Sequence, residues 1–363
     1  MSLNIAILGA SGAVGSALSA HILRSDLLEP GDHLQLVGHD EPNCTGRLFA
    51  TRMDLLDAFD DHRVLIDVLP DLSSSDADLV VVAASMPMPA DLSDRREMAL
   101  MNLALFRHTA DLCSRHLPDS TYIIVSNPVE LAVKIFSETI GCNQVIGMGA
   151  EQDSLRFARS IARNLRVSRH EIGAGVWGEH GRNMVPIWSS VRLRSHDPGK
   201  INALAELKAK AAAQPLPERA QQLQSQVQAH LASGEFELAY QLTEESLPDA
   251  RIFVEPFITK SVIHSTPHAT ANAVLNCIRA WKEDDDRMLH AQVMLDGELE
   301  GMVGICGVPV GFGPAGWQLN DCENLDPTEK AQVQHAFNAI QTFLDDCALE
   351  AKPLSSSSGP YRK

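Results

Sequence analysis

Three side chains between residues 151 and 183 have the types and the spacing of an acid–base site. Asp153 and Arg156 stand three positions apart in a stretch of helical periodicity, so both can face the same side of a helix. His180 follows an apolar stretch that predicts a buried strand, and glycines flank it closely. A carboxylate upstream can hold such a histidine in one tautomer and increase its basicity, which suits a general base near neutral pH. A surface ion pair and a turn histidine would give the same pattern, so these residues alone leave both interpretations open.

The composition limits the classes of partner. The 363 residues are 45% hydrophobic and 21% charged, which is typical of a globular protein, and the length allows two domains. The formal net charge of -17 argues against nucleic acid and against an acidic membrane surface, because their phosphates would be repelled. An anionic small substrate would need arginines concentrated at its site.

Cysteine usage and the start of the chain indicate a compartment. The seven cysteines are scattered and form no C-x-x-C pair, so the sequence predicts neither a disulfide framework nor a metal site. Residues 3–8 enter a strand at once, which leaves no room for a signal peptide, and the longest uncharged apolar run, residues 79–90, is too short to span a bilayer. We therefore expect a soluble cytoplasmic protein with reduced thiols, no bound metal and no membrane partner.

A glycine-rich turn follows the first predicted strand and precedes a predicted helix at residues 13–24 and a second strand at residues 34–38. In this context the glycines let backbone N–H groups and a helix N-terminus approach a pyrophosphate. The context distinguishes the motif from a plain tight turn and predicts a dinucleotide site. The candidate cofactor-binding residues of the turn are Gly9, Ala10, Ser11, Gly12, Ala13, Val14 and Gly15.

The end of the second predicted strand bears on the choice between NAD and NADP. An acidic residue normally accepts hydrogen bonds from the adenosine ribose here, but Gly38 stands at that position. The missing acid removes repulsion toward a 2′-phosphate, which His39 or Arg47 could contact. Asp40 and Glu41 argue for NAD, so both cofactors stay open and NAD is favoured.

Alternating strands and helices continue to about residue 150. Further apolar runs predict parallel strands, and the one at residues 78–84 is apolar on both faces, as a central strand should be. The pattern predicts an α/β fold with a doubly wound parallel sheet of the Rossmann type over residues 1–150. Ligands lie at the carboxyl ends of the strands in such sheets. The predicted strand exits are Gly9, Gly38, Ser85 and Asn127.

The remaining residues predict a second, α+β domain at 151–350 that carries the substrate site. It includes a helical insertion at about 200–246, late stretches that suggest antiparallel strands, and a final helix. Residues 351–363 are rich in serine, and we expect a disordered tail there.

Four motifs, in this order, resemble those of the lactate/malate dehydrogenases. They are Gly9-x-x-Gly12-x-x-Gly15, Ser126-Asn127-Pro128-Val129, Asp153-x-x-Arg156-Phe157 and Gly178-Glu179-His180-Gly181, the last followed by Val185-Pro186-Ile187-Trp188-Ser189. The glycine turn is closer to the malate dehydrogenase form. The resemblance runs from Asn4 to about Leu344, and four ordered motifs are far more specific than any single one.

The resemblance implies an NAD(P)-dependent 2-hydroxyacid dehydrogenase, which transfers a hydride between the nicotinamide and C2 of a 2-hydroxy or 2-oxo acid. His180 would exchange the hydroxyl proton as general acid/base, and Asp153 would orient the imidazole. Arg156 would grip the substrate carboxylate with its planar fork, a contact that lysine cannot reproduce. The family usually forms dimers or tetramers, which implies a homo-oligomer.

Three further residues receive roles from the resemblance. Arg95, on the proline-bearing loop, would close over the substrate and polarise its carbonyl oxygen, although an ordinary surface arginine would look the same in the sequence. Asn127 would hydrogen-bond that oxygen or the carboxamide region of the cofactor. Thr266 falls near the family's substrate-side threonine or serine.

Two departures from the family pattern bear on the substrate. Malate dehydrogenases carry a second loop arginine for the distal carboxylate, but residues 84–94 contain no arginine or lysine, and Met88 falls near that position. We therefore expect a substrate with an apolar or neutral side group, unless Arg96 or Arg182 substitutes. Arg182 also replaces the family's aspartate beside His180, where its charge would lower the basicity of the imidazole or bind an anionic substituent.

Two other functions fit the same glycine turn. An NAD- and metal-dependent glycosidase shares the fold, but it needs a Cys/His metal pair, and residues 147–153 contain no cysteine. A non-catalytic nicotinamide-binding protein would account for Gly38 and Arg182. The joint retention of Asp153, Arg156 and His180 favours the enzyme.

Overall fold

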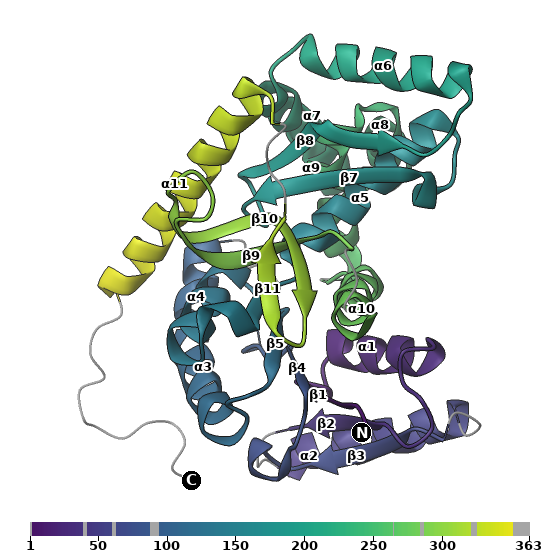
Figure 1. Cartoon of the computed structure of the whole chain (residues 1–363). Coiled ribbons are helices and arrows are strands. Elements are labelled where there is room, and N and C mark those ends of the chain that lie inside the picture. Colours follow the sequence, from purple (N-terminus) through teal and green to yellow (C-terminus); the bar gives the residue numbers. More distant parts are fainter. Residues whose placement is uncertain are drawn as a thin grey trace.

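The N-terminal half of the chain folds into a parallel sheet with helices on both faces (Figure 1). The structure is a computed structural model, and it describes residues 2–38, 42–59, 63–87, 94–263, 265–283, 287–320 and 325–350. The strand order in this half is β3-β2-β1-β4-β5-β6, which confirms the predicted doubly wound sheet. The strands are β1 Asn4–Leu8, β2 His33–Val37, β3 Leu65–Leu69, β4 Leu79–Val82, β5 Thr121–Ile124 and β6 Val145–Gly147. The helices are α1 Ala13–Arg24, α2 Pro42–Ala58, α3 Arg95–His116 and α4 Val129–Thr139.

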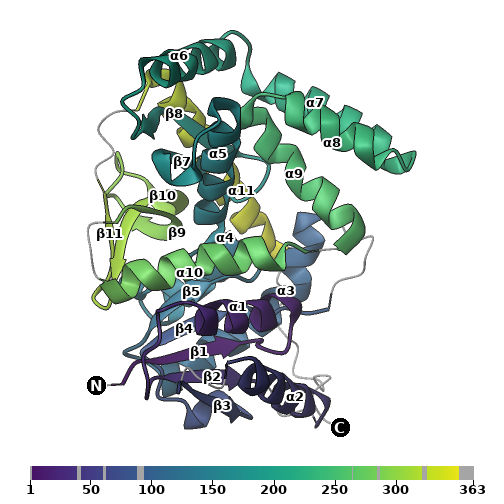
Figure 2. The ribbon, with the colours of Figure 1, turned by 90° about the vertical axis from the view of Figure 1, so that its right-hand side faces the viewer.

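Helices cover both faces of this sheet, and its central strand β4 is apolar and buried at every position. Ile5 and Ile7 of β1 pack with residues of α1, α2 and α10, whereas Ala6 and Leu8 point the other way, toward α3, α4 and α11. Figure 2 shows α1 lying along α10, so a helix from late in the chain covers part of the N-terminal sheet.

The second half extends the same sheet instead of starting a new one. Gly147 of β6 pairs antiparallel with Gln292 of β9, and the sheet continues in the order β9-β10-β7-β8, with β11 paired to β10. The later strands are β7 Ile172–Gly178, β8 Met184–Leu193, β9 Leu289–Asp296, β10 Val303–Gly313 and β11 Gly316–Leu319. The sequence does not predict this junction. The division at residue 150 stays a prediction.

Helices make up the rest of the second half. They are α5 Gly149–Leu165, α6 Pro198–Ala212, α7 Leu216–Ala232, α8 Phe236–Glu245, α9 Pro248–Ile263, α10 Pro267–Glu283 and α11 Pro327–Glu350. In both ribbon views α6, α7 and α8 lie at the end of the molecule opposite α1 and α2. In the described ranges no helix has the length and apolarity that crossing a membrane requires. The predicted tail, residues 351–363, lies outside the described residues.

Candidate active site

The glycine turn has the geometry of a nucleotide cradle. Gly9 has a φ of +84°, and a Cβ on Gly15 would lie 2.4 Å from the Gly9 carbonyl oxygen, so neither position accepts a side chain without strain. Gly12 caps α1 without a side-chain hydrogen bond, and the first turn of the helix carries no acidic residue. Its N–H groups and the positive end of the helix therefore suit an anionic group. Gly12 and Ala13 are exposed, which leaves the turn accessible.

Gly38 has a steric reason to be glycine. A Cβ there would lie 2.6 Å from the Leu48 Cδ1 and 3.0 Å from the Cys44 Sγ, because α2 packs closely against the end of β2. A ribose-binding acid at this position would have to displace the Leu48 side chain. His39 lies outside the described residues, as do Asp40 and Glu41, and the preference for NAD stays a prediction.

The structure brings His180, Asp153 and Arg156 together. The His180 Nδ1 lies 2.6 Å from the Asp153 Oδ2, and the Arg156 Nη1 donates to the Asp153 Oδ1 at 2.6 Å. Helix α5 supplies both Asp153 and Arg156, and its first residue, Gly149, passes so close beneath the imidazole that a Cβ there would lie 2.6 Å from the His180 Cβ. The His180 Nε2 is thereby left as the ring nitrogen that can exchange a proton with a ligand.

Asp153 is held in its charged form. Burial opposes ionisation, since only 1% of the residue is exposed, but His180 and Arg156 together keep the pKa of the Asp153 carboxyl below its ordinary value. The carboxylate can therefore stabilise an imidazolium at neutral pH. Glu255 of α9 lies 3.8 Å from the Arg156 Nε and also pairs with Arg159.

Arg95 is placed differently from the prediction. It is the first residue of α3 and not a loop residue, because the Asp94 side chain caps the helix by accepting from the Arg96 N–H at 2.8 Å. Its guanidinium pairs with Glu130 of α4 and with Glu179, and its Cζ lies 5.1 Å above the Phe343 ring.

Glu130 and Glu179 were not among the predicted site residues. Glu130 is fully buried, and its Oε1 accepts the backbone N–H of His180 at 2.7 Å. Glu179 accepts from the Asn183 N–H at 2.9 Å and from the Asn183 Nδ2 at 2.7 Å. The sequence carried a signal for both, because Glu130 directly follows Asn127-Pro128-Val129 and Glu179 directly precedes His180.

The other predicted ligand-binding residues lie at the edges of this cluster. Asn127 is exposed at the end of β5, and its carbonyl oxygen accepts from the Asn102 Nδ2 at 3.3 Å. The Thr266 Oγ1 accepts from the Nε2 of Gln152, the residue before Asp153, at 3.1 Å, which places Thr266 against α5. Arg182 is exposed.

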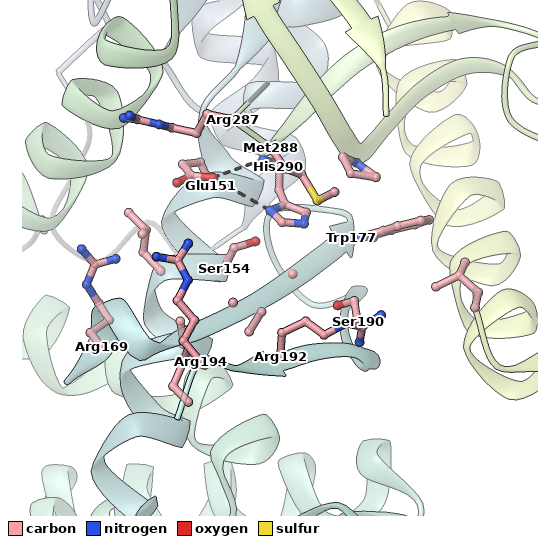
Figure 3. Close-up of a pocket in the computed structure, with 18 residues that line it drawn as sticks. Glu151, Ser154, Arg169, Trp177, Ser190, Arg192, Arg194, Arg287, Met288 and His290 are labelled. Atoms are coloured by element: carbon pink, nitrogen blue, oxygen red, sulfur yellow. Dashed lines mark hydrogen bonds and ion pairs between the residues drawn. The ribbon is translucent and has the colours of Figure 1, made fainter. Parts of the chain in front are cut away.

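A pocket of about 520 Å³ is lined by residues of α5, β7, β8 and β9 (Figure 3). Its α5 lining residues are Glu151, Ser154, Leu155 and Ala158, about half a helical turn away from Asp153 and Arg156. Arg169, Arg192, Arg194 and Arg287 also line it. Inside it the His290 N–H donates to the Glu151 Oε2 at 3.1 Å, and burial lowers the pKa of His290 to about 4. The pocket contains none of the predicted site residues, so it is separate from the candidate active site.

Among the described residues, the histidine, cysteine, aspartate and glutamate side chains form no group of three or more that could hold a metal ion.

Comparisons with known proteins give one family. Residues 3–147 match the model of the lactate/malate dehydrogenase NAD-binding domain. The chain is similar to an L-2-hydroxycarboxylate dehydrogenase (NAD(P)(+)) of Methanocaldococcus jannaschii, at 24% identity over 95% of this chain and 99% of the relative. It is also similar to a malate dehydrogenase of Methanothermobacter marburgensis, at 25% identity over 95% and 99%.

Solved structures share the fold. Malate dehydrogenase from Cryptosporidium parvum matches 96% of this chain and 100% of its own length, with a TM-score of 0.72 at 21% identity. A lactate dehydrogenase enzyme from a Medee basin deep-sea metagenome library matches 96% of this chain and 99% of its own, with a TM-score of 0.74 at 18% identity.

Proposed function

Since the chain belongs to the lactate/malate dehydrogenase family, we propose that it is an NAD(P)-dependent oxidoreductase that interconverts a 2-hydroxy and a 2-oxo carboxylic acid, with His180 as general acid/base. The observation that carries the proposal is the 2.6 Å contact between the His180 Nδ1 and the buried Asp153, beside an arginine. The M. jannaschii and M. marburgensis relatives are named dehydrogenases, which does not favour the glycosidase or the non-catalytic alternative.

The glycine turn and the uncapped N-terminus of α1 would hold the pyrophosphate of the cofactor, with Gly9, Gly12 and Gly15 supplying close backbone approach. A bound nicotinamide supplies hydride transfer.

His180 and Asp153 move and stabilise the proton. With the Nδ1 held by Asp153, the His180 Nε2 takes the hydroxyl proton when the substrate carbon loses its hydride, and it returns that proton in the reduction. The imidazolium formed in the oxidation direction is stabilised by the adjacent carboxylate. Arg156 offers the guanidinium nitrogens that Asp153 does not occupy to the substrate carboxylate, which orients C2 toward the cofactor.

The two arginines whose contacts lie around His180, Arg95 and Arg156, are already paired with carboxylates, which favours a substrate with a single carboxylate. Arg95 pairs with two carboxylates, Glu130 and Glu179, and Arg156 has Asp153 as its partner with Glu255 nearby. A distal carboxylate buried here would face glutamates already engaged with Arg95, and an unpaired buried charge costs several kcal/mol. We therefore propose a 2-hydroxy acid with a neutral or apolar side group. Met88, which falls near the position of the family's second arginine, lies outside the described residues.

A substrate panel tests both levels of the proposal. Purified protein is mixed with NADH or NADPH and with 2-oxo acids that carry apolar, neutral or carboxylate side groups, and the absorbance of the reduced cofactor is followed. We expect kcat/KM for the neutral acids to exceed that for oxaloacetate by at least about tenfold, since a missing charge partner costs more than 1.4 kcal/mol. A preference for oxaloacetate would refute the substrate class only, whereas no cofactor oxidation with any acid would refute the activity.

Assembly into a dimer or tetramer and a cytoplasmic location stay predictions. Light scattering on the purified protein tests the first, because a homo-oligomer has a mass that is a multiple of 39.5 kDa.

A further inference from the structure

Glu130 is a buried carboxylate between two parts of the candidate active site. None of its surface is exposed, and it lies in the first turn of α4, directly after the end of β5 and the exposed Asn127. Its two oxygens have different partners. The Oε1 accepts the backbone N–H of His180 at 2.7 Å, and the Oε2 pairs with the Arg95 Nη2.

We infer that Glu130 is a positioning residue for the proposed reaction: by accepting the His180 backbone N–H, its carboxylate fixes the position of the His180 main chain and thereby the orientation of the imidazole. The inference rests on the proposed function. His180 then has two anchors on different elements, its ring Nδ1 on Asp153 of α5 and its backbone N–H on Glu130 of α4. Helix α4 follows β5 of the N-terminal parallel sheet, so the second anchor ties the histidine to the half of the fold that carries the glycine turn.

No neighbouring acid can replace Glu130 in this role. Glu179 is next to His180 in the chain, but its carboxylate is occupied by Arg95 and by the two Asn183 donors. Asp153 is engaged with the imidazole and with Arg156. A side chain at position 130 that cannot accept a hydrogen bond would leave the half-buried His180 N–H without this partner.

Arg95 holds this arrangement in place by pairing with both glutamates. Burial, together with Glu179, raises the pKa of the Glu130 carboxyl above its ordinary value, and Arg95 opposes that rise. The three groups come from α3, α4 and the segment after β7, and Arg95 bridges the two carboxylates. The same arrangement favours glycine at position 181, because a Cβ on Gly181 would lie 2.6 Å from the Arg95 Nη1.

The test compares variants that remove different parts of Glu130. Glu130→Ala removes the acceptor and the charge, Glu130→Gln keeps an acceptor oxygen at the same reach, and Glu130→Asp keeps the charge but is one methylene too short to contact both partners. Glu138→Ala is the matched control on α4, because Glu138 is exposed and pairs only with Lys134 in the described contacts. Circular dichroism and thermal unfolding establish which variants are folded.

The kinetic measurement compares how far each Glu130 variant changes kcat and how far it changes KM. We expect Glu130→Ala and Glu130→Asp to lower kcat by about 10²-fold with KM changed by less than about threefold, because a small displacement of the acid/base group affects the chemical step. Glu130→Gln should recover most of kcat. An alanine or aspartate variant with kcat within twofold of the wild type would overturn the inference. So would a loss in Glu179→Gln as large as that in Glu130→Ala, because Arg95 alone would then carry the effect.

A second readout needs no turnover. Exchange of the His180 backbone amide with deuterium is followed by NMR with isotope-labelled histidine, and we expect it to be at least about tenfold faster in folded Glu130→Ala or Glu130→Asp than in Glu130→Gln. Equal exchange in all variants would overturn the inference. If the wild type oxidised no cofactor with any acid, the proposed function would fail, and the exchange rates would still decide whether Glu130 fixes His180.

Discussion

Replacement of Asp153 by asparagine is the sharpest test of the candidate acid–base pair. The variant keeps the size of the side chain but removes its charge, and it places an amide where the Oδ2 now meets the His180 Nδ1 at 2.6 Å. If the amide nitrogen faces the imidazole, the Nδ1 must act as acceptor, so the proton moves to the Nε2. The nitrogen that should take the substrate proton is then blocked.

The size of the effect follows from the buried charge pair. An imidazolium and a carboxylate about 4 Å apart between charge centres attract each other by about 4 kcal/mol at an effective dielectric constant of about 20. Loss of that attraction in the transition state corresponds to a decrease of about 10³-fold in kcat. Arg156 keeps an acceptor in the amide oxygen, so KM for the 2-oxo acid should change by less than about tenfold.

Initial rates in both directions, with the cofactor followed by its absorbance, measure the effect. Asp197→Asn is the matched control, because Asp197 is an exposed helix cap of α6 and asparagine caps helices equally well. Binding of NADH, measured by fluorescence, should be unchanged, since Asp153 is not part of the glycine turn. A loss of kcat smaller than about tenfold would refute the assignment of His180 and Asp153 as an acid–base pair, because general acid–base catalysis contributes at least about 10²-fold.

The same variant has a signature in stability. The pKa of Asp153 is lowered in the folded protein from its ordinary value of 3.8, so its charge stabilises the fold above about that pH, and the contribution is lost as the pH falls through the folded pKa. The difference in unfolding free energy between wild type and Asp153→Asn should therefore be largest at neutral pH and shrink in acid. A difference that stays constant would show that the charge contributes nothing to stability.

Four further outcomes are expected. Arg156→Lys should lower kcat/KM by about 10²-fold, since lysine has no planar fork, and a value within threefold of the wild type in initial-rate assays would contradict that role. Gly15→Ala should weaken NADH binding at least about tenfold by calorimetry, because its Cβ would lie 2.4 Å from the Gly9 oxygen; unchanged affinity would argue against the cradle. His290 has a pKa of about 4 in the folded protein against 6.5 in the unfolded chain, so the wild type should lose up to about 3 kcal/mol of stability as the pH falls from 6.5 to 4. His290→Gln should lose less stability over the same range in urea titrations. Parallel dependences of stability on pH in the two proteins would contradict this. Arg182→Ala should change the preference among 2-oxo acids more than cofactor binding, and equal changes on every acid would count against it.

The fold was predictable because its signals are local. The apolar run of β1, the glycines after it and the periodicity of α1 are contiguous, and each has one physical interpretation. The junction between the two halves was not predictable, because the pairing of Gly147 with Gln292 joins residues far apart in the chain. The sequence of neither strand indicates which strand it pairs with.

The candidate site also has a part that could be predicted from local motifs and a part that could not. His180, Asp153 and Arg156 could be proposed together because each lies in a motif of recognisable spacing. The position of Arg95 could not be predicted for two reasons. The Asp94 side chain caps α3, so the helix begins at Arg95 and the loop ends before it. The partners of the Arg95 guanidinium are also 35 and 84 positions away in the chain. Gly38 is explained by the close approach of Leu48 and Cys44, which no strand or helix pattern reveals.

The shared sheet makes the two halves poor modules for recombination. Cutting the chain after β6 would expose the backbone donors and acceptors of β9 along a new edge and would strip α10 and α11 from the surfaces that they cover. A chimera that borrows the nucleotide half from a relative would therefore need a compatible partner for Gly147 and matching helices on both sides. Swapping short segments at the strand exits leaves that backbone ladder intact, and it is the safer route to changing what the protein acts on.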